Sequence, residues 1–403
     1  MTPPSSPVPR PMLLPDPLAQ LASTLSKIGR TRVGRDLTVN PPIQRASTLL
    51  FDEADGLFSD ANRTYGLEGL SVHDCLKGAL LAVEGGAGCT LAPSGLAACT
   101  LALLAATRSG DEVLITDSVY RPTRRFADGL LSRFGVTARY FDPACGAQID
   151  SLIQPNTRLI WLESPGSITF EVQDIPAITS VARARGVLTA IDNTWSAGVF
   201  FKPFEHGVDL SIQALTKYQA GHADVLMGSV IGASADVAEQ VAACNLMLGM
   251  GVSPDDAYLV LRGLRTMPVR LAQQGASALK VAHWLSAQAA VSSVLHPALP
   301  GAPGHALWAR DFTGASGVFG FTLAQAWPDQ AVSRFMSDLS LFGIGASWGG
   351  FESLIVPGDR MMARSATRWQ ASGPLFRLSI GLEDPNDLIA DLDAGLAQLS
   401  LPL

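Results

Sequence analysis

The chain contains few charged residues for its length. Lys, Arg, Asp and Glu make up 16% of its 403 residues, whereas 47% are hydrophobic, and the formal net charge is −7. This composition excludes a disordered chain and indicates large buried sheets and an extensive subunit interface. Because the net charge is negative and no basic stripe is present, we do not expect a nucleic-acid partner.

A long hydrophobic run is also missing. The longest mostly apolar stretch, residues 96–106, is about half of the roughly 20 residues that a membrane-spanning helix needs. The proline-rich residues 1–11 lack both the apolar core of an export signal and the Arg-rich amphipathic helix of an organellar one. These absences predict a cytoplasmic protein without a membrane span.

Cysteine and histidine patterns that mark disulfides or metals are absent. The five cysteines are odd in number and never in CxxC spacing: Cys75, Cys89, Cys99, Cys145 and Cys244. We therefore expect reduced thiols. The six histidines form neither an HxH nor an HExxH group, so no metal site is predicted.

Helices and strands alternate through the middle of the chain. Residues 1–68 are irregular apart from a helix around 17–28, and we interpret them as an extended segment that clasps a neighbouring subunit. Residues 69–265 predict an α/β domain with a mostly parallel central sheet and helices on both faces. The expected helices are 74–84, 96–106, 122–134 and 175–185, and the expected strands are 112–116, 138–141, 158–163, 187–191, a short one before Lys217, and 224–231.

The last third of the chain has a different pattern. Residues 266–403 contain shorter strands at 318–323 and 376–380 with helices between them, which predicts a smaller C-terminal α+β domain. A long amphipathic helix over 253–284 should join the two domains and break at Pro268, because proline removes a helix hydrogen bond.

Two residues at the ends of neighbouring expected strands give the strongest chemical signal. Lys217 follows an apolar strand and is the only Lys or Arg between Arg185 and Arg262 apart from Lys202, while Asp192 ends the preceding strand. Pyridoxal phosphate chemistry requires such a pair, an amine for a Schiff base and a carboxylate for the pyridine nitrogen. A surface lysine and a turn-capping aspartate are the plain alternative. With Glu163, these residues mark the carboxyl ends of the strands, where α/β sheets bind ligands.

A phosphate site is expected where Ser94, Gly95 and Leu96 begin a helix. A glycine at a helix entry lets backbone N–H groups approach a phosphate, and the helix N-terminus favours its negative charge. Thr216, beside the lysine, offers a further hydroxyl. Helix capping without a ligand remains the alternative interpretation of the Ser-Gly pair.

Aromatic and arginine candidates complete the set. Tyr120 follows a strand and can stack on a cofactor ring, although core or surface packing is the favoured explanation when the tyrosine is taken alone. Arg377 is a single cation in an apolar strand, suited to a carboxylate in a bidentate fork. An internal salt bridge with Glu383 or Asp384 would also explain it. Gly349 and Gly350 indicate a close backbone approach or a turn.

Together these stretches resemble the Cys/Met-metabolism family of pyridoxal-phosphate enzymes, and within it the bacterial cystathionine β-lyases. The similarity extends from about residue 40 to the C-terminus. Glu-Ser-Pro-Gly-Ser and Ser-Trp-Gly-Gly-x-Glu-Ser are the stretches that favour the lyase branch. The matching segments are 82–89, 161–169, 191–199, 211–218, 347–354 and 377–384. The resemblance implies the PLP-dependent aminotransferase-like fold (fold type I) and pyridoxal 5'-phosphate as the cofactor.

The resemblance also implies a role for each candidate. Lys217 would carry the cofactor and act as base and acid, Asp192 would pair with the pyridinium, and Tyr120 would stack over the ring. Ser94, Gly95, Leu96 and Thr216 would contact the phosphate, as would Tyr65 from the neighbouring subunit. Arg377, with Ser347 and Trp348, would bind the substrate α-carboxylate. The active unit would be a dimer with shared sites, usually paired into a homotetramer.

Four positions depart from the family pattern. Leu67 stands where a phosphate-binding arginine is usual, which predicts weaker cofactor binding unless another cation compensates. Glu68 replaces a second arginine and Arg125 replaces an aspartate, so we expect the two to lie together at the distal end of the substrate pocket. Ala346 replaces a tyrosine and should widen the pocket mouth.

The predicted activity is α,β-elimination from a cysteine thioether, with L-cystathionine giving homocysteine, pyruvate and ammonia in methionine biosynthesis. A cysteine-S-conjugate β-lyase, a cysteine desulfhydrase or a γ-acting relative of the same fold is the nearest alternative. A non-catalytic protein that retains the fold is a further alternative, because the usual phosphate arginine is missing.

Overall fold

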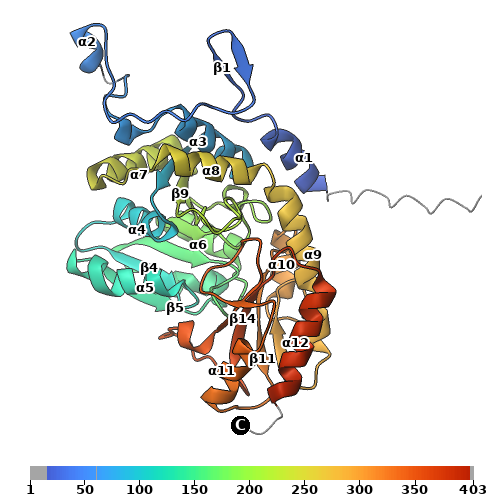
Figure 1. The fold of residues 1–403 in the computed structure, drawn as a ribbon. Coiled ribbons are helices and arrows are strands. Elements are labelled where there is room, and N and C mark those ends of the chain that lie inside the picture. The colour runs from blue at the N-terminus through green and yellow to red at the C-terminus, as the bar shows by residue number, and fades with distance from the viewer. Residues whose placement is uncertain (1–15, 60, 400–403) are drawn as a thin grey trace, which may run out of the picture.

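A seven-stranded sheet forms the centre of the computed structural model, which describes residues 16–59 and 61–399 (Figure 1). Strands β4 to β8 pair in parallel, and β9 runs antiparallel to both of its neighbours. The spatial order is β3 (Gly88–Ala92), β9 (Gly228–Gly232), β8 (Leu210–Gln213), β7 (Leu188–Asp192), β6 (Thr157–Glu163), β4 (Glu112–Thr116) and β5 (Thr137–Phe141). The predicted mostly parallel sheet is confirmed.

Helices cover both faces of this sheet because the side chains of its buried strands are apolar on both sides. In β4, Leu114 packs into the core on one face, whereas Val113 and Ile115 pack into the core on the other. On the Leu114 face lie α3 (Ser71–Glu84), α6 (Ile175–Arg185) and α8 (Pro254–Leu264). On the opposite face lie α4 (Gly95–Ala106), α5 (Arg121–Phe126), a π-helical turn (Ala127–Leu131) and α7 (Ala235–Leu248).

Two strands of the sheet differ from the prediction. Strand β3 was not expected, because the glycines at its start indicate a loop. The short apolar run that follows them pairs with β9. The predicted strand 224–231 begins only at Gly228, because the preceding residues form a loop in which Ala223 has a φ of 57° and Leu226 is exposed.

A second, five-stranded sheet forms the lower part of the molecule in Figure 1. In order it contains β10 (Val291–Leu295), β11 (Val318–Leu323), β14 (Leu375–Ser379), β13 (Leu354–Pro357) and β12 (Gly343–Ile344). The helices of this part are α9 (Met267–Ser286), α10 (His305–Asp311), α11 (Asp329–Ser337) and α12 (Pro385–Leu399). Phe319, Phe321 and Phe376 pack with Leu388 in a separate hydrophobic core.

The long helix predicted between the two sheets is broken, as expected. Helix α8 ends at Leu264 and α9 begins at Met267, so the break falls just before Pro268. Pro268 occupies the first turn of α9, where its missing N–H removes no helix hydrogen bond.

The N-terminal segment packs its first helix against α9 and extends its hairpin and second helix away from the body of the molecule (Figure 1). It contains α1 (Asp16–Leu25), the hairpin β1 (Thr31–Val33) and β2 (Asp36–Thr38), and the short helix α2 (Ala54–Leu57). Large apolar side chains such as Leu37, Leu50 and Phe58 are exposed along it. The proline-rich stretch at residues 1–11 lies outside the described residues. None of the helices described is long and apolar enough to cross a membrane.

Candidate active site

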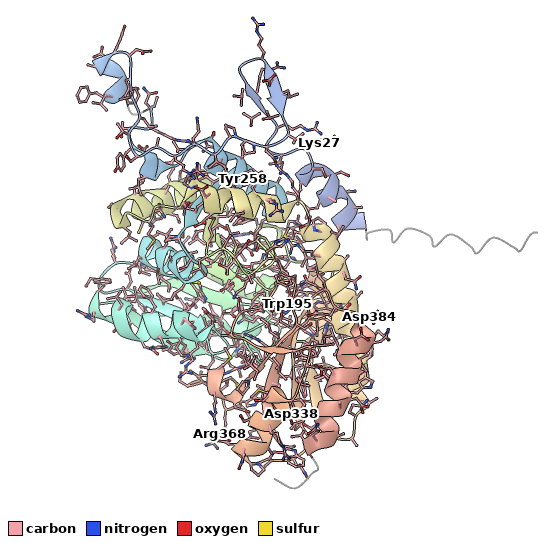
Figure 2. The ribbon with its side chains drawn as sticks, in the orientation of Figure 1. Lys27, Trp195, Tyr258, Asp338, Arg368 and Asp384 are labelled. Atoms are coloured by element: carbon pink, nitrogen blue, oxygen red, sulfur yellow. The ribbon has the colours of Figure 1, made fainter. Side chains whose placement is uncertain are left out.

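A cavity of about 510 Å³ lies beyond the carboxyl ends of β6, β7 and β8. Most of the predicted site residues line it: Ser94, Gly95, Leu96, Tyr120, Arg125, Asp192, Thr216, Lys217, Trp348 and Arg377. Trp195, labelled in the middle of Figure 2, also lines the cavity, and its Nε1 donates to the backbone oxygen of Val318 at 2.9 Å. Since Val318 begins β11, the cavity lies where the two sheets meet.

Lys217 brings its amine into this cavity from the turn that follows β8. Its Nζ donates to Ser347 Oγ at 2.8 Å and lies 5.3 Å from the centre of the Trp348 ring. Burial, together with nearby Arg377, lowers the pKa of Lys217 to about 8, although Asp192 acts in the opposite direction. An amine with this pKa is partly neutral near physiological pH and can act as a nucleophile or a base.

Asp192 is the last residue of β7, and one of its two oxygens is already occupied. Oδ1 accepts hydrogen bonds from the N and Oγ1 of Thr194 at 3.1 and 2.5 Å. The thiol of Cys99 donates to Oδ2 at 3.8 Å. Burial raises the pKa of Asp192, while the bonds from Thr194 and the charge of Lys217 oppose that rise. Oδ2 therefore remains available to a stronger donor such as a protonated ring nitrogen.

The start of α4 forms a cradle for an anion. Ser94 caps the helix by accepting a bond from Ala97 N at 3.0 Å, and the first residues of the helix line the cavity. Gly95 packs directly on Ala214, and a Cβ added there would lie 2.5 Å from the Ala214 Cβ. Thr216 Oγ1 accepts a bond from Met227 N at 3.0 Å. A glycine is therefore required where the helix N-terminus approaches the lysine-bearing turn.

Tyr120 lies at the end of the turn after β4 and is held by a buried glutamate. Its backbone N donates to Glu163 Oε2 at 2.7 Å. Burial raises the pKa of Glu163 well above its ordinary value, and Asp192 adds to that rise. Sequence reasoning noted Glu163 at a strand end without including it in the site. That position was the signal that could have identified it, whereas Cys99, inside an apolar helix, gave none.

Arg377 lies in β14 and faces the cavity from the second sheet. Its Nη2 donates to the backbone oxygens of Gly345, Ala346 and Ser347 at 3.2, 3.0 and 2.9 Å. Burial lowers its pKa to about 10, and its buried Nε has no hydrogen-bond partner. The alternative salt bridge is not formed among the described residues. A guanidinium that lines a cavity without a carboxylate partner suits a carboxylate ligand.

Tyr65 and Glu68 lie outside this cavity within a single chain. Tyr65 is about half exposed, and Glu68 Oε1 accepts bonds from Thr64 N and Tyr65 N at 2.7 and 3.0 Å. Burial raises the pKa of Glu68, but these bonds outweigh burial and lower it overall. Contact of Glu68 with Arg125 requires a neighbouring subunit, so their pairing stays a prediction.

The residues of the cavity fit pyridoxal phosphate. An amine and a carboxylate both face the space, the N-terminus of α4 offers N–H groups to a phosphate, and the Arg377 side chain lines the cavity wall. Within residues 16–59 and 61–399, no group of three or more His, Cys, Asp or Glu side chains could hold a metal ion.

The sequence profile of the Cys/Met metabolism PLP-dependent enzymes matches residues 24–397. The chain belongs to this family. It is 46% identical to a putative cystathionine beta-lyase of Rhizobium johnstonii over 95% of this chain and 97% of that protein. It is 44% identical to cystathionine beta-lyase MetC of Escherichia coli strain K12 over 94% of this chain and 99% of that protein.

A solved structure gives the same fold. Cystathionine gamma synthase from Xanthomonas oryzae pv. oryzae superimposes with a TM-score of 0.86 at 31% identity, over 94% of this chain and 98% of that chain. The fold, the membership of an enzyme family and the pyridoxal phosphate cofactor expected from the sequence are therefore confirmed.

Proposed function

We propose that the protein is a carbon–sulfur β-lyase that cleaves L-cystathionine to homocysteine, pyruvate and ammonia. The observation that carries this proposal is the buried amine of Lys217, which has a pKa of about 8 and lies between the acid of one sheet and the carboxylate-binding residues of the other. Relatives at 44–46% identity carry the names of cystathionine β-lyases.

The chain's own residues divide the work of holding the cofactor. Lys217 would hold its aldehyde, Asp192 would keep the pyridine nitrogen protonated, and Tyr120 would lie against the ring. The anion cradle of Ser94, Gly95, Leu96 and Thr216 would hold the phosphate. When bound, the cofactor would supply an electron sink for the substrate Cα.

The protein residues that bind the substrate come mainly from the second sheet. The guanidinium of Arg377, with Ser347 and Trp348, orients the substrate α-carboxylate. Lys217 removes the Cα proton and delivers a proton to the sulfur that leaves Cβ, with the Tyr120 phenol nearby. One water is consumed, so cystathionine and water give homocysteine, pyruvate and ammonia in balance.

We propose that the protein is a cytoplasmic homotetramer built from two dimers. The N-terminal segment projects from the body and exposes Leu37, Leu50 and Phe58, as a segment that packs against a second copy would. Tyr65 lies on the loop after α2, half exposed and outside its own cavity. We propose that it enters the neighbour's site and contacts the phosphate there.

The proposed lyase and its alternatives differ in product. Purified protein incubated with L-cystathionine should yield pyruvate, whereas γ-elimination would yield 2-oxobutyrate. A cysteine-S-conjugate β-lyase or a desulfhydrase would also give pyruvate, but with a higher kcat/KM on S-conjugates or on cysteine. Borohydride treatment followed by peptide mass spectrometry should place a reduced cofactor on Lys217. A colourless protein that gains no label with added cofactor would favour the non-catalytic alternative.

A further inference from the structure

Two arginines lie at the outer part of the active-site cavity. Arg121 and Arg125 both line it, and both are exposed. They are four residues apart, at the first and fifth positions of α5, so their side chains leave the same side of the helix. This exposed wall of the cavity therefore carries two positive charges.

Arg121 and Arg125 make fewer polar contacts within the fold than Arg124, which lies between them in the sequence. Arg124, between them, is buried and forms an ion pair with Asp117 at 2.5 Å. Arg125 has no hydrogen bond or ion pair with any residue that the structure describes. Over the same residues, Arg121 makes a single bond, from Nη1 to the backbone oxygen of Arg360 at 2.6 Å, and no ion pair. Both side chains thus keep donors for a ligand.

The carboxylates that line the cavity do not neutralise the charges of Arg121 and Arg125. Glu163 and Asp192 are the two carboxylates that line it, and both are at the inner end, at the ends of β6 and β7. Glu163 accepts from Tyr120 N, and Asp192 accepts from Thr194. The outer region that a single subunit contributes is therefore positive, and a cleft of one sign attracts a ligand group of the other.

We propose that Arg121 and Arg125 bind an anionic group at the far end of the leaving thiol. The preferred substrates are then cysteine thioethers whose sulfur substituent ends in a carboxylate. A substituent whose only distal charge is an ammonium is repelled, and a neutral one gains nothing. The inference rests on the proposed β-lyase activity and specifies the class of substrate that this site takes.

Three S-substituted cysteines of similar size test this preference in the purified holoenzyme. S-(2-carboxyethyl)-L-cysteine carries the distal anion, S-propyl-L-cysteine is neutral, and S-(2-aminoethyl)-L-cysteine carries a cation. With pyruvate as the readout, kcat/KM should be about tenfold higher for the anionic than for the neutral substrate, and lowest for the cationic one. The advantage should shrink as ionic strength rises.

Charge reversal identifies the residues responsible. In Arg121→Glu and Arg125→Glu the ratio of kcat/KM for the anionic over the cationic substrate should fall about tenfold, and the double variant should reverse the order. Arg133→Glu is the matched control, because Arg133 is exposed, follows the same helical segment and does not line the cavity. The control should keep the wild-type ratio.

The outcomes distinguish a failure of the proposed β-lyase function from a failure of the charge preference alone. If no substrate gives pyruvate, the proposed function is wrong. If pyruvate forms from all three substrates at similar kcat/KM, β-elimination stands and the charge preference is overturned. A wild-type preference for the cationic substrate would also overturn it and would indicate that the partner subunit's Glu68 controls the outer cavity.

Discussion

The Nζ of Lys217 donates to the Oγ of Ser347 at 2.8 Å, a bond that joins residues 130 positions apart. Lys217 follows β8 of the central sheet, whereas Ser347 lies between β12 and β13 of the second sheet. The reactive amine and the residues proposed to bind the substrate carboxylate therefore come from different sheets. Catalysis then depends on how the two sheets are held together, because small displacements of reacting groups are costly.

Replacing Ser347 tests this bond. In Ser347→Ala the lysine amine loses its hydrogen-bond acceptor, while the anion cradle on α4 is untouched. We expect kcat/KM to fall about 2- to 10-fold, in line with the loss of one hydrogen bond. Cofactor affinity, measured by titration of the apoprotein, should change little. A large loss of cofactor affinity would show that Ser347 supports the cofactor site instead.

The low pKa of Lys217 predicts how cofactor binding depends on pH. Only the neutral amine attacks an aldehyde, so the rate of binding to apoprotein should rise as pH increases and level off above about 8, the pKa to which burial and Arg377 lower this group. The measurement is the growth of visible absorbance after rapid mixing with pyridoxal phosphate. A rate that climbs until the ordinary lysine pKa of 10.5 would contradict the assignment.

Glu163 is predicted to be a positioning residue that acts through Tyr120. Because its raised pKa favours the neutral acid, Glu163→Gln should retain the acceptor for Tyr120 N and change kcat less than about threefold. Glu163→Ala leaves that buried N–H unsatisfied and should lower kcat about tenfold. Near-UV circular dichroism of the bound cofactor should change in the alanine variant alone. Equal effects of the two substitutions would contradict this role.

Asp117 ties the loop that precedes β14 to the central sheet. Beside Arg124, its carboxylate accepts from the backbone N of Ser365, Ala366 and Thr367 at 2.9, 3.1 and 2.7 Å. Asp117→Asn removes the buried charge opposite Arg124 and should cost about 3–5 kcal/mol of unfolding free energy in urea titration. Asp393→Asn, at an exposed position of α12, is the control and should change it by less than about 0.5 kcal/mol.

The stability that Asp117 contributes to the fold also depends on pH. Burial raises its pKa, but the bonds from Thr367, Ser365 and Arg124 outweigh burial and lower the pKa overall. A carboxyl group with a lowered folded-state pKa stabilises the fold above its ordinary pKa, and this contribution is lost as pH falls through the folded value. The difference in stability between wild type and Asp117→Asn should therefore narrow in acid. A constant difference from pH 7 to pH 3 would contradict this.

Local pattern was sufficient for much of the central sheet. Apolar runs that end in Glu163 and Asp192 mark β6 and β7, since strands covered on both faces need no polar alternation. The same logic failed at β3, where Gly88 and the residues before it resemble a loop and the pairing with β9 comes from sequence far away. Local sequence pattern also gave no reason to include Cys99 or Arg121 among the predicted site residues.

The sequence by itself determined the parallel sheet, the acid and amine at its strand ends and the chemistry they imply, because each follows from apolar runs and residue types within a short stretch. Tertiary structure alone decided that Arg377 and Ser347 meet Lys217, that Glu163 holds Tyr120, and that Arg121 lines the same cavity. These contacts depend on how the second sheet and α5 pack around the cavity, and packing joins residues whose distance along the chain carries no signal.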